Sequence, residues 1–194
     1  MTDAARPGTR RSGRAAEGAG ARRGGNPASQ DPTGGGVSAP DLVVLAGLQG
    51  AGKSSFYRAR FAATHAHVSK DLFRSARDKG RRQRELVTAA ARAGGPAVID
   101  DTNPRRADRA VLVALARELG MRPLLYWFPP DVRASLARNA ERTGRAQVPK
   151  VAIFATAQRL EPPEPAEGFA SVYEVQAAPE GAFLVTARPE LGAP

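Results

Sequence analysis

The chain has 194 residues, of which 42% are apolar, so it is long enough for one domain with a buried core. It has no apolar run of about 18 residues, so no membrane-spanning helix is expected. It also has no cysteine, which excludes disulfides, thiolate metal sites and a cysteine nucleophile. The net charge is +10, and residues 53–150 carry 21 Lys or Arg against 9 acids. This excess would attract phosphate-rich ligands, although solvated Arg-rich helices would give the same count.

Residues 1–40 are rich in Gly, Ala, Arg, Pro and Ser and have almost no large apolar side chain. They cannot bury enough surface to offset chain entropy, so we expect a disordered tail. The tail lacks the apolar core of a secretory signal, and its arginine pairs leave a nucleic-acid contact or a targeting role open. We expect a cytoplasmic protein whose folded domain covers residues 41–194.

An all-apolar run at residues 42–46 predicts a strand buried on both faces. The turn after it, Gly47-Leu48-Gln49-Gly50-Ala51-Gly52-Lys53-Ser54, fits the pattern of a phosphate-binding P-loop, and a helix is expected to follow through residue 63. Its N–H groups and the positive helix end would bind phosphates, Lys53 would reach the β- and γ-phosphates, and Ser54 would bind Mg2+. The alternative without a nucleotide site is an ordinary Gly-rich turn capped by Ser.

A short second strand is expected at residues 66–69, and Asp71 and Arg74 follow it. Because the carboxyl ends of parallel strands line the ligand crevice, these two side chains fall where a substrate should bind. A basic helical stretch then runs to about Arg92, and we expect Gly80 to interrupt it. Its charges indicate either a solvated face or one wall of a groove for a polyanion.

A third buried strand, residues 96–99, ends in Asp100 and Asp101. P-loop enzymes hold Mg2+ or its waters from a carboxylate at this position. Side chains alternate along a strand, so we expect only one of the pair to face the phosphates. A turn and helix cap is the structural alternative for residues 100–104.

An amphipathic helix is predicted for residues 105–119, with Val111, Leu112, Leu115 and Leu119 inward. A strand at residues 124–128 and an arginine-rich helix at 131–142 follow. Arg138 and Arg142 precede a glycine-bearing loop, so residues 138–150 are a candidate lid over transferring phosphates; a solvated surface helix is the alternative. A helix at 148–160 and strands at 171–175 and 183–185 complete the chain.

This alternation of strands and helices predicts an α/β fold. We expect a P-loop NTPase of the nucleoside-kinase-like type, a three-layer sandwich with a mainly parallel sheet. The expected nucleotide-binding residues are Gly47, Gly50, Ala51, Gly52, Lys53, Ser54, Ser55, Arg138 and Arg142. The expected ligands of Mg2+ are Ser54 and one or both of Asp100 and Asp101.

Five stretches occur in a fixed order: residues 47–54, 69–74, 98–104, 138–142 and 159–169. Together they resemble polynucleotide 5'-hydroxyl kinases, over about residues 41–176. The resemblance implies that Asp71 is the general base, that Arg74 contacts the acceptor's phosphate, and that Arg138 and Arg142 are lid arginines. Lys70 stands where these kinases commonly have Arg, which keeps a cation but loses a bidentate fork.

The sequence thus predicts an ATP-dependent kinase, with Mg2+, acting on 5'-hydroxyl ends of DNA or RNA. Its expected catalytic residues are Asp71, Lys53, Arg74 and Arg142. One alternative is a small-molecule hydroxyl kinase on the same scaffold. The other is a nucleotide-dependent switch without acceptor chemistry.

Overall fold

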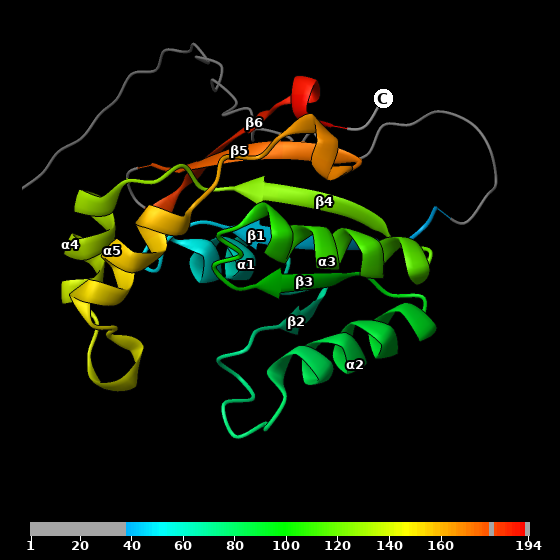
Figure 1. Ribbon diagram of the computed structural model, residues 1–194, viewed down its shortest axis with the longest axis horizontal. Coiled ribbons are helices and arrows are strands. Elements are labelled where there is room, and N and C mark those ends of the chain that lie inside the picture. Colours follow the sequence, from blue (N-terminus) through cyan, green and yellow to red (C-terminus); the bar gives the residue numbers. More distant parts are fainter. Residues whose placement is uncertain (1–37, 179–180, 193–194) are drawn as a thin grey trace, which may run out of the picture. The chain divides into compact units, whose positions relative to one another are not determined.

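The computed structural model describes residues 38–178 and 181–192, and in them six strands form one sheet in the order β2-β3-β1-β4-β5-β6 (Figure 1). Neighbouring strands from β2 to β5 are parallel, and β6 pairs with β5 in the antiparallel sense. The strands are β1 (Asp41–Ala46), β2 (Ala66–Val68), β3 (Ala97–Asp100), β4 (Arg122–Trp127), β5 (Ser171–Ala177) and β6 (Phe183–Ala187). The predicted tail lies outside the described residues, apart from residues 38–40.

Helices connect the strands and cover both faces of the sheet. They are α1 (Lys53–Arg60), α2 (Lys79–Arg92), α3 (Arg106–Glu118), α4 (Val132–Ala140) and α5 (Lys150–Arg159). Short 3-10 turns are η1 (Gly144–Ala146), η2 (Pro165–Glu167) and η4 (Pro189–Leu191). Among the described residues, no helix has both the length and the apolar character needed to cross a bilayer.

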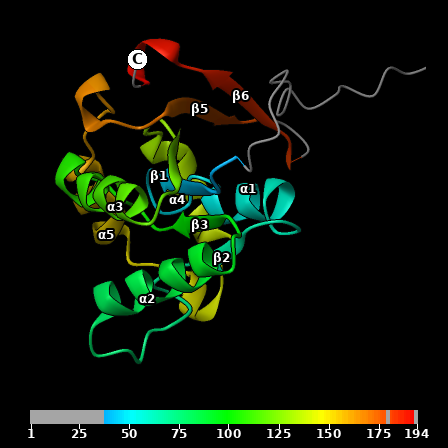
Figure 2. The ribbon, with the colours of Figure 1, turned by 90° about the vertical axis from the view of Figure 1, so that its right-hand side faces the viewer.

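β1 is the central element of the core because both of its faces are covered. Leu42 and Val44 pack with residues of α2 and α3, whereas Val43 and Leu45 pack with the aromatic side chains of α1. Figure 2 shows α3 and α1 on opposite sides of the sheet. The predicted α/β fold with a mainly parallel sheet is therefore confirmed, as is the three-layer arrangement.

Two details of the sequence prediction are wrong. Gly80 does not interrupt a helix, because α2 begins at Lys79 and the carboxylate of Asp78 caps it by accepting from the N–H of Arg81. Val111 does not point inward: it is 66% exposed, and Val113 and Ala116 are buried in its place. The buried stripe of α3 also includes Arg109, and a count of apolar residues alone misjudged its phase.

The register of the sheet positions the site. Asp100 at the end of β3 pairs with Leu45 of β1, and the glycine turn begins two residues later. β2 pairs with β3 up to Val68, so the chain that follows β2 leaves from the same edge. The residues after β1, β2 and β3 therefore meet at the carboxyl edge of the sheet.

Candidate functional site

The glycine turn between β1 and α1 has positions where no side chain fits. Gly47 has a φ of 149°, and a Cβ there would lie 2.7 Å from the Cβ of Phe128. Gly50 has a φ of 78°, and a Cβ there would lie 2.5 Å from the carbonyl oxygen of Ser135 in α4. Both neighbouring atoms are close to the backbone framework and cannot easily move away. The packing therefore requires glycine at both positions.

The side chain of Lys53 packs against the backbone of the glycine turn. It is buried, and its Nζ donates to the carbonyl oxygens of Gly47 at 3.0 Å and Leu48 at 2.7 Å. Burial lowers the pKa of Lys53 to about 8, although the charges of Asp100 and Asp101 oppose this shift. A buried ammonium group with a lowered pKa gains stability from an added anion, so the turn favours a ligand such as phosphate.

Asp100 lies beside this turn and is only 7% exposed. Its Oδ2 lies 3.2 Å from Nε2 of His67, and its carboxylate also forms a hydrogen bond with Ser54. Burial alone would raise the pKa of Asp100, but these hydrogen bonds and the charge of Lys53 outweigh burial and lower it. Asp100 is therefore a carboxylate held ionised beside the P-loop serine. His67 is fixed in turn by stacking on the ring of Tyr57, with ring centroids 3.9 Å apart.

Asp101 has different surroundings. Its carboxylate accepts from the backbone N–H of Lys70 at 3.0 Å and from the side-chain amide of Gln83 at 2.7 Å. Burial raises the pKa of Asp101, against the opposing effect of these contacts. Asp101 thus fixes the start of the segment that carries Asp71, whereas Asp100 is the neighbour of Ser54.

Asp71 is open to the cleft, with 82% of its side chain exposed. Nη2 of Arg74 lies 3.5 Å from its Oδ1, and Nε of Arg74 donates to its main-chain carbonyl at 3.1 Å. The charge of Asp71 also acts on Lys53, whose pKa it raises against the larger effect of burial. Asp71 therefore lines the same cleft as Gly50, Gly52 and Lys53 of the glycine turn.

The candidate lid is anchored on the turn at its base. Nη1 of Arg138 donates to the carbonyl oxygen of Gly50 at 3.1 Å. The buried side chain of Asn139 makes two hydrogen bonds to the backbone of Val148, at 2.9 and 3.0 Å, and so closes the loop between α4 and α5. Arg142 follows the end of α4 in this loop and lines the cleft. The base of the segment is thus fixed, and Arg142 projects from it.

One cleft of ≈ 1190 Å³ brings most of the predicted site residues together. Those that line it are Gly50, Gly52, Lys53, Ser54, Ser55, Asp71, Arg74, Asp100, Asp101 and Arg142. Three predicted residues are outside this lining: Gly47 packs on Phe128, Ala51 packs toward the α1 side of the core, and Arg138 contacts Gly50.

The oxygen ligands that this cleft offers to a metal are few. Within the part of the chain that the structure describes, no group of three or more His, Cys, Asp or Glu side chains is placed to hold a metal ion. Mg2+ commonly takes one or two protein oxygens and completes its shell with water and substrate phosphates. The adjacent oxygens of Ser54 and Asp100 fit that ligand set.

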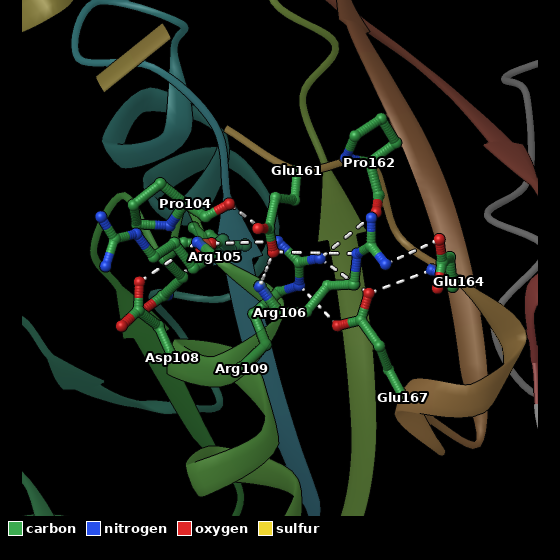
Figure 3. A network of polar contacts seen from close by, with 11 residues as sticks. Pro104, Arg105, Arg106, Asp108, Arg109, Glu161, Pro162, Glu164 and Glu167 are labelled. Carbon is green, nitrogen blue, oxygen red and sulfur yellow. Dashed lines mark hydrogen bonds and ion pairs between the residues drawn. The ribbon is translucent and has the colours of Figure 1, made fainter. Parts of the chain in front are cut away.

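A buried network supports the turn from behind (Figure 3). Arg109 of α3 is fully buried, and its Nε and Nη2 donate to the two carboxylate oxygens of Glu167 at 2.6 and 2.7 Å. Its Nη1 donates to the carbonyl oxygens of Asn103 at 3.2 Å and Pro104 at 3.3 Å. The side chain of Asn103 then donates to the carbonyl oxygen of Leu45 at 2.8 Å. Residues 161–168 are thereby connected to the strand that enters the P-loop.

Sequence reasoning missed Arg109 and His67. Arg109 lies three and four residues before Leu112 and Val113, so the phase of the buried stripe was an available signal. No such signal exists for His67, whose partner Asp100 is 33 residues away.

These observations define the class of the protein. A parallel sheet with a glycine turn after its central strand, and a carboxylate at the end of the neighbouring strand, make this a P-loop kinase-like domain. The chain belongs to the AAA_33 family of AAA domains, whose sequence profile matches residues 42–163.

Similar folds occur in several solved structures. A fungal RNA kinase has a TM-score of 0.57 and 13% identity, over 72% of this chain and 38% of that one. A sugar kinase from a Janibacter species has a TM-score of 0.52 and 21% identity, over 70% of this chain and 86% of that one. Kti12 from Chaetomium thermophilum, in complex with ADP-AlF3, has a TM-score of 0.52 and 15% identity, over 70% of this chain and 89% of that one. At these identities the likeness is one of fold.

Proposed function

We propose that this protein is a kinase that transfers the γ-phosphoryl group of ATP to the 5'-hydroxyl end of DNA or RNA. The observation that carries the proposal is the position of Asp71, which lies in one cleft with Lys53 and the glycine turn. A P-loop alone is compatible with a binding module, but an exposed carboxylate across from it can accept the proton of an attacking hydroxyl. The family and the resemblance to a fungal RNA kinase fold support the proposal.

The phosphates of ATP bind in the glycine turn, where the start of α1 adds the positive end of the helix dipole. Lys53 exchanges its hydrogen bonds to Gly47 and Leu48 for bonds to phosphate oxygens. This exchange replaces dipolar partners with charged ones, and it explains why a lysine is kept buried here. The complex of Kti12 with ADP-AlF3 supports a nucleotide in a fold of this kind.

Asp71 accepts the proton of the acceptor hydroxyl while the hydroxyl oxygen attacks the γ-phosphorus. The bond between the γ-phosphorus and the bridging oxygen breaks, and ADP leaves. Arg74, which lies beside Asp71, would bind the acceptor's phosphate. Arg142 balances negative charge on the transferring group, and Arg138 keeps Gly50 in place. Ser54 and Asp100, with Asp101 outside the shell, would hold Mg2+, which neutralises charge on the β- and γ-phosphates when bound.

The test is transfer from γ-labelled ATP to a 5'-hydroxyl oligonucleotide. Asp71→Asn should lower the transfer rate at least about a hundredfold while ATP affinity stays unchanged, because only the proton acceptor is lost. Asp131→Asn is the matched control, since Asp131 is an exposed acid outside the cleft lining and Asn keeps an acceptor for the N–H of Ala134. Equal rates for wild type and Asp71→Asn would remove the proposed base.

A hydroxyl-bearing small molecule is the second candidate acceptor. The cleft volume of ≈ 1190 Å³ exceeds that of ordinary small-ligand pockets, roughly 300–1,000 Å³, so ATP and a small acceptor could occupy it together. A panel with sugars beside oligonucleotides separates the candidates. Transfer to sugars alone would reject the polynucleotide and leave the kinase.

A further inference from the structure

The cleft does not end at Asp71 and Arg74 but continues as a furrow between α2 and α3. The residues that line this extension are Asp78, Arg81 and Arg84 on the α2 side and Asp108, Val111 and Leu115 on α3. The phosphoryl-transfer chemistry described above uses none of them. The furrow is therefore a part of the cleft whose ligand is still unassigned.

The α3 side of the furrow has an exposed apolar side chain. Val111 is 66% exposed although its neighbours on α3, Leu112 and Leu115, are nearly buried. An exposed Val on a helix surface is unremarkable alone, but this one lies inside a cleft that adjoins a candidate catalytic base. The apolar contact surface is thus continuous with the proposed acceptor site.

The charges along the furrow favour an anion. The carboxylate of Asp78 accepts from the N–H of Arg81, and that of Asp108 accepts from the N–H of Arg105, so both acids act as helix caps. The side chain of Arg81 is 72% exposed, and its partner Glu85 is an exposed residue one turn away at 3.1 Å. Exposed pairs of this kind are weak, so a phosphate can take the place of Glu85.

Arg84 has a fixed position on the same wall. Its Nη2 donates to both carboxylate oxygens of Glu118, which joins α2 to α3. This exposed bridge connects the two helices, and Arg81 and Val111 line the same cleft from either helix. A guanidinium group binds phosphate through charge-assisted hydrogen bonds, and Val111 adds an apolar contact surface for a base on the opposite wall.

We infer that the furrow binds the second nucleotide of a single-stranded acceptor, with its phosphate on Arg81 and its base against Val111. This inference rests on the proposed polynucleotide kinase activity and extends it, since Arg74 serves the phosphate of the first nucleotide. A base paired and stacked in a duplex cannot reach a side chain between two helices, so the strand must be single at this point.

The experiment compares kcat/KM for a nucleoside 3'-phosphate, a dinucleotide 3'-phosphate and the same dinucleotide step at a flush duplex end. Wild type should prefer the dinucleotide over the other two. Arg81→Gln should reduce kcat/KM for the dinucleotide about fivefold and leave the nucleoside 3'-phosphate unchanged, as expected for one exposed charge contact. Val111→Ser should act on the same acceptor only.

Two matched controls are available. Arg82→Gln changes the adjacent arginine, which also pairs with Glu85 and is 49% exposed, but which does not line the cleft. Val151→Ser changes a valine that is 71% exposed on α5, away from the cleft lining. Both should leave all three acceptors unaffected. Because the four substituted side chains are exposed, folding should be preserved, and a thermal melt verifies it.

Each outcome is decisive. Equal kcat/KM for the nucleoside and dinucleotide acceptors, or equal effects of Arg81→Gln and Arg82→Gln, would overturn the furrow and leave the kinase proposal intact. Loss of activity on the nucleoside 3'-phosphate as well would mean that Arg81 acts on the first nucleotide, which also overturns the inference. Absence of both transfer to and binding of any oligonucleotide by wild type would overturn the proposed function and the furrow together.

Discussion

Replacement of Glu167 by Gln should reduce the free energy of unfolding by about 3–5 kcal/mol, the usual cost of removing one partner from a buried ion pair. The structure supports a value in this range because Arg109 is fully buried and the side chain of Glu167 is 5% exposed. Gln keeps an oxygen acceptor for the backbone N–H of Glu164, so the loss reports on the charge of Arg109 and not on the turn. The guanidinium group would remain buried beside only neutral partners.

Removing both charges should be less harmful than removing one. In the double variant Arg109→Met, Glu167→Leu, the unpaired charge disappears. The remaining cost is about 1 kcal/mol for each lost hydrogen bond, three to the carbonyl groups of Asn103, Pro104 and Pro162 and one from the N–H of Glu164. A double variant at least as stable as Glu167→Gln is therefore expected. This sign is specific to an uncompensated buried charge and does not follow from lost packing.

Urea unfolding followed by fluorescence measures both variants. The chain has one tryptophan, Trp127, and its ring lies 5.8 Å from the guanidinium carbon of Arg109, so the probe reports directly on the network. The exposed pair of Arg84 and Glu118 provides the control, and Glu118→Gln should cost less than about 1 kcal/mol. A loss below about 1 kcal/mol for Glu167→Gln would refute the reasoning, because the buried charge would then not depend on Glu167.

Four further predictions concern the turn and its neighbours. Gly50→Ala should lose ATP binding and lower the melting temperature, because its Cβ would lie 2.5 Å from the carbonyl oxygen of Ser135 and its φ is positive; a melt with and without ATP measures both effects, and unchanged ATP affinity would contradict it. The pKa of Lys53 is about 8 in the folded protein against an ordinary 10.5, so between pH 8 and 10.5 the unfolded chain binds more protons than the folded one. The free energy of unfolding of wild type should therefore rise relative to that of Lys53→Met as the pH rises through this range. For the same reason ATP binding near pH 8 should take up about half a proton, since the phosphates restore the raised pKa; calorimetry in two buffers of different ionisation enthalpy detects it, and zero uptake would contradict it. Asp100→Asn should raise the Mg2+ concentration needed for transfer, because Asp100 is the neighbour of Ser54. Asp101→Asn should leave that concentration unchanged and raise the KM of the acceptor, because Asp101 contacts Lys70. Equal Mg2+ titrations of the two variants would reject this division.

The parts of the fold that the sequence predicted are those encoded locally. β1 was recognisable because its residues are apolar on both faces, and the glycine turn because its shape depends on consecutive residues such as Gly47 and Gly50. The position of Asp71 followed from one topological rule, that parallel strands share a carboxyl edge. Local pattern and that rule together were enough to gather most of the cleft.

The parts that the sequence did not predict depend on contacts between distant residues. Arg109 and Glu167 are 58 residues apart in the chain. Charged residues are usually exposed, so each looks like a surface residue in the sequence until the buried face of α3 is known. Val111 was misplaced for the same reason, because a shift of one residue moves a helical side chain by about 100°. The distinction between Asp100 and Asp101 depends on His67, Lys70 and Gln83, none of which lies in the stretch 98–104 that contains the two acids.

The network around Arg109 also changes what the resemblance to polynucleotide kinases can support. Two of the stretches that carry the resemblance, residues 98–104 and 159–169, supply partners of Arg109 in this network. Asn103 stabilises the end of β1, just before the P-loop, through its hydrogen bond to the carbonyl oxygen of Leu45. Glu167 does not line the cleft. Such motifs therefore support the scaffold of phosphoryl transfer more strongly than they support a particular acceptor. The evidence for the acceptor must come from residues outside these two stretches, and Asp71, Arg74, Arg81 and Val111 line the cleft where an acceptor would bind.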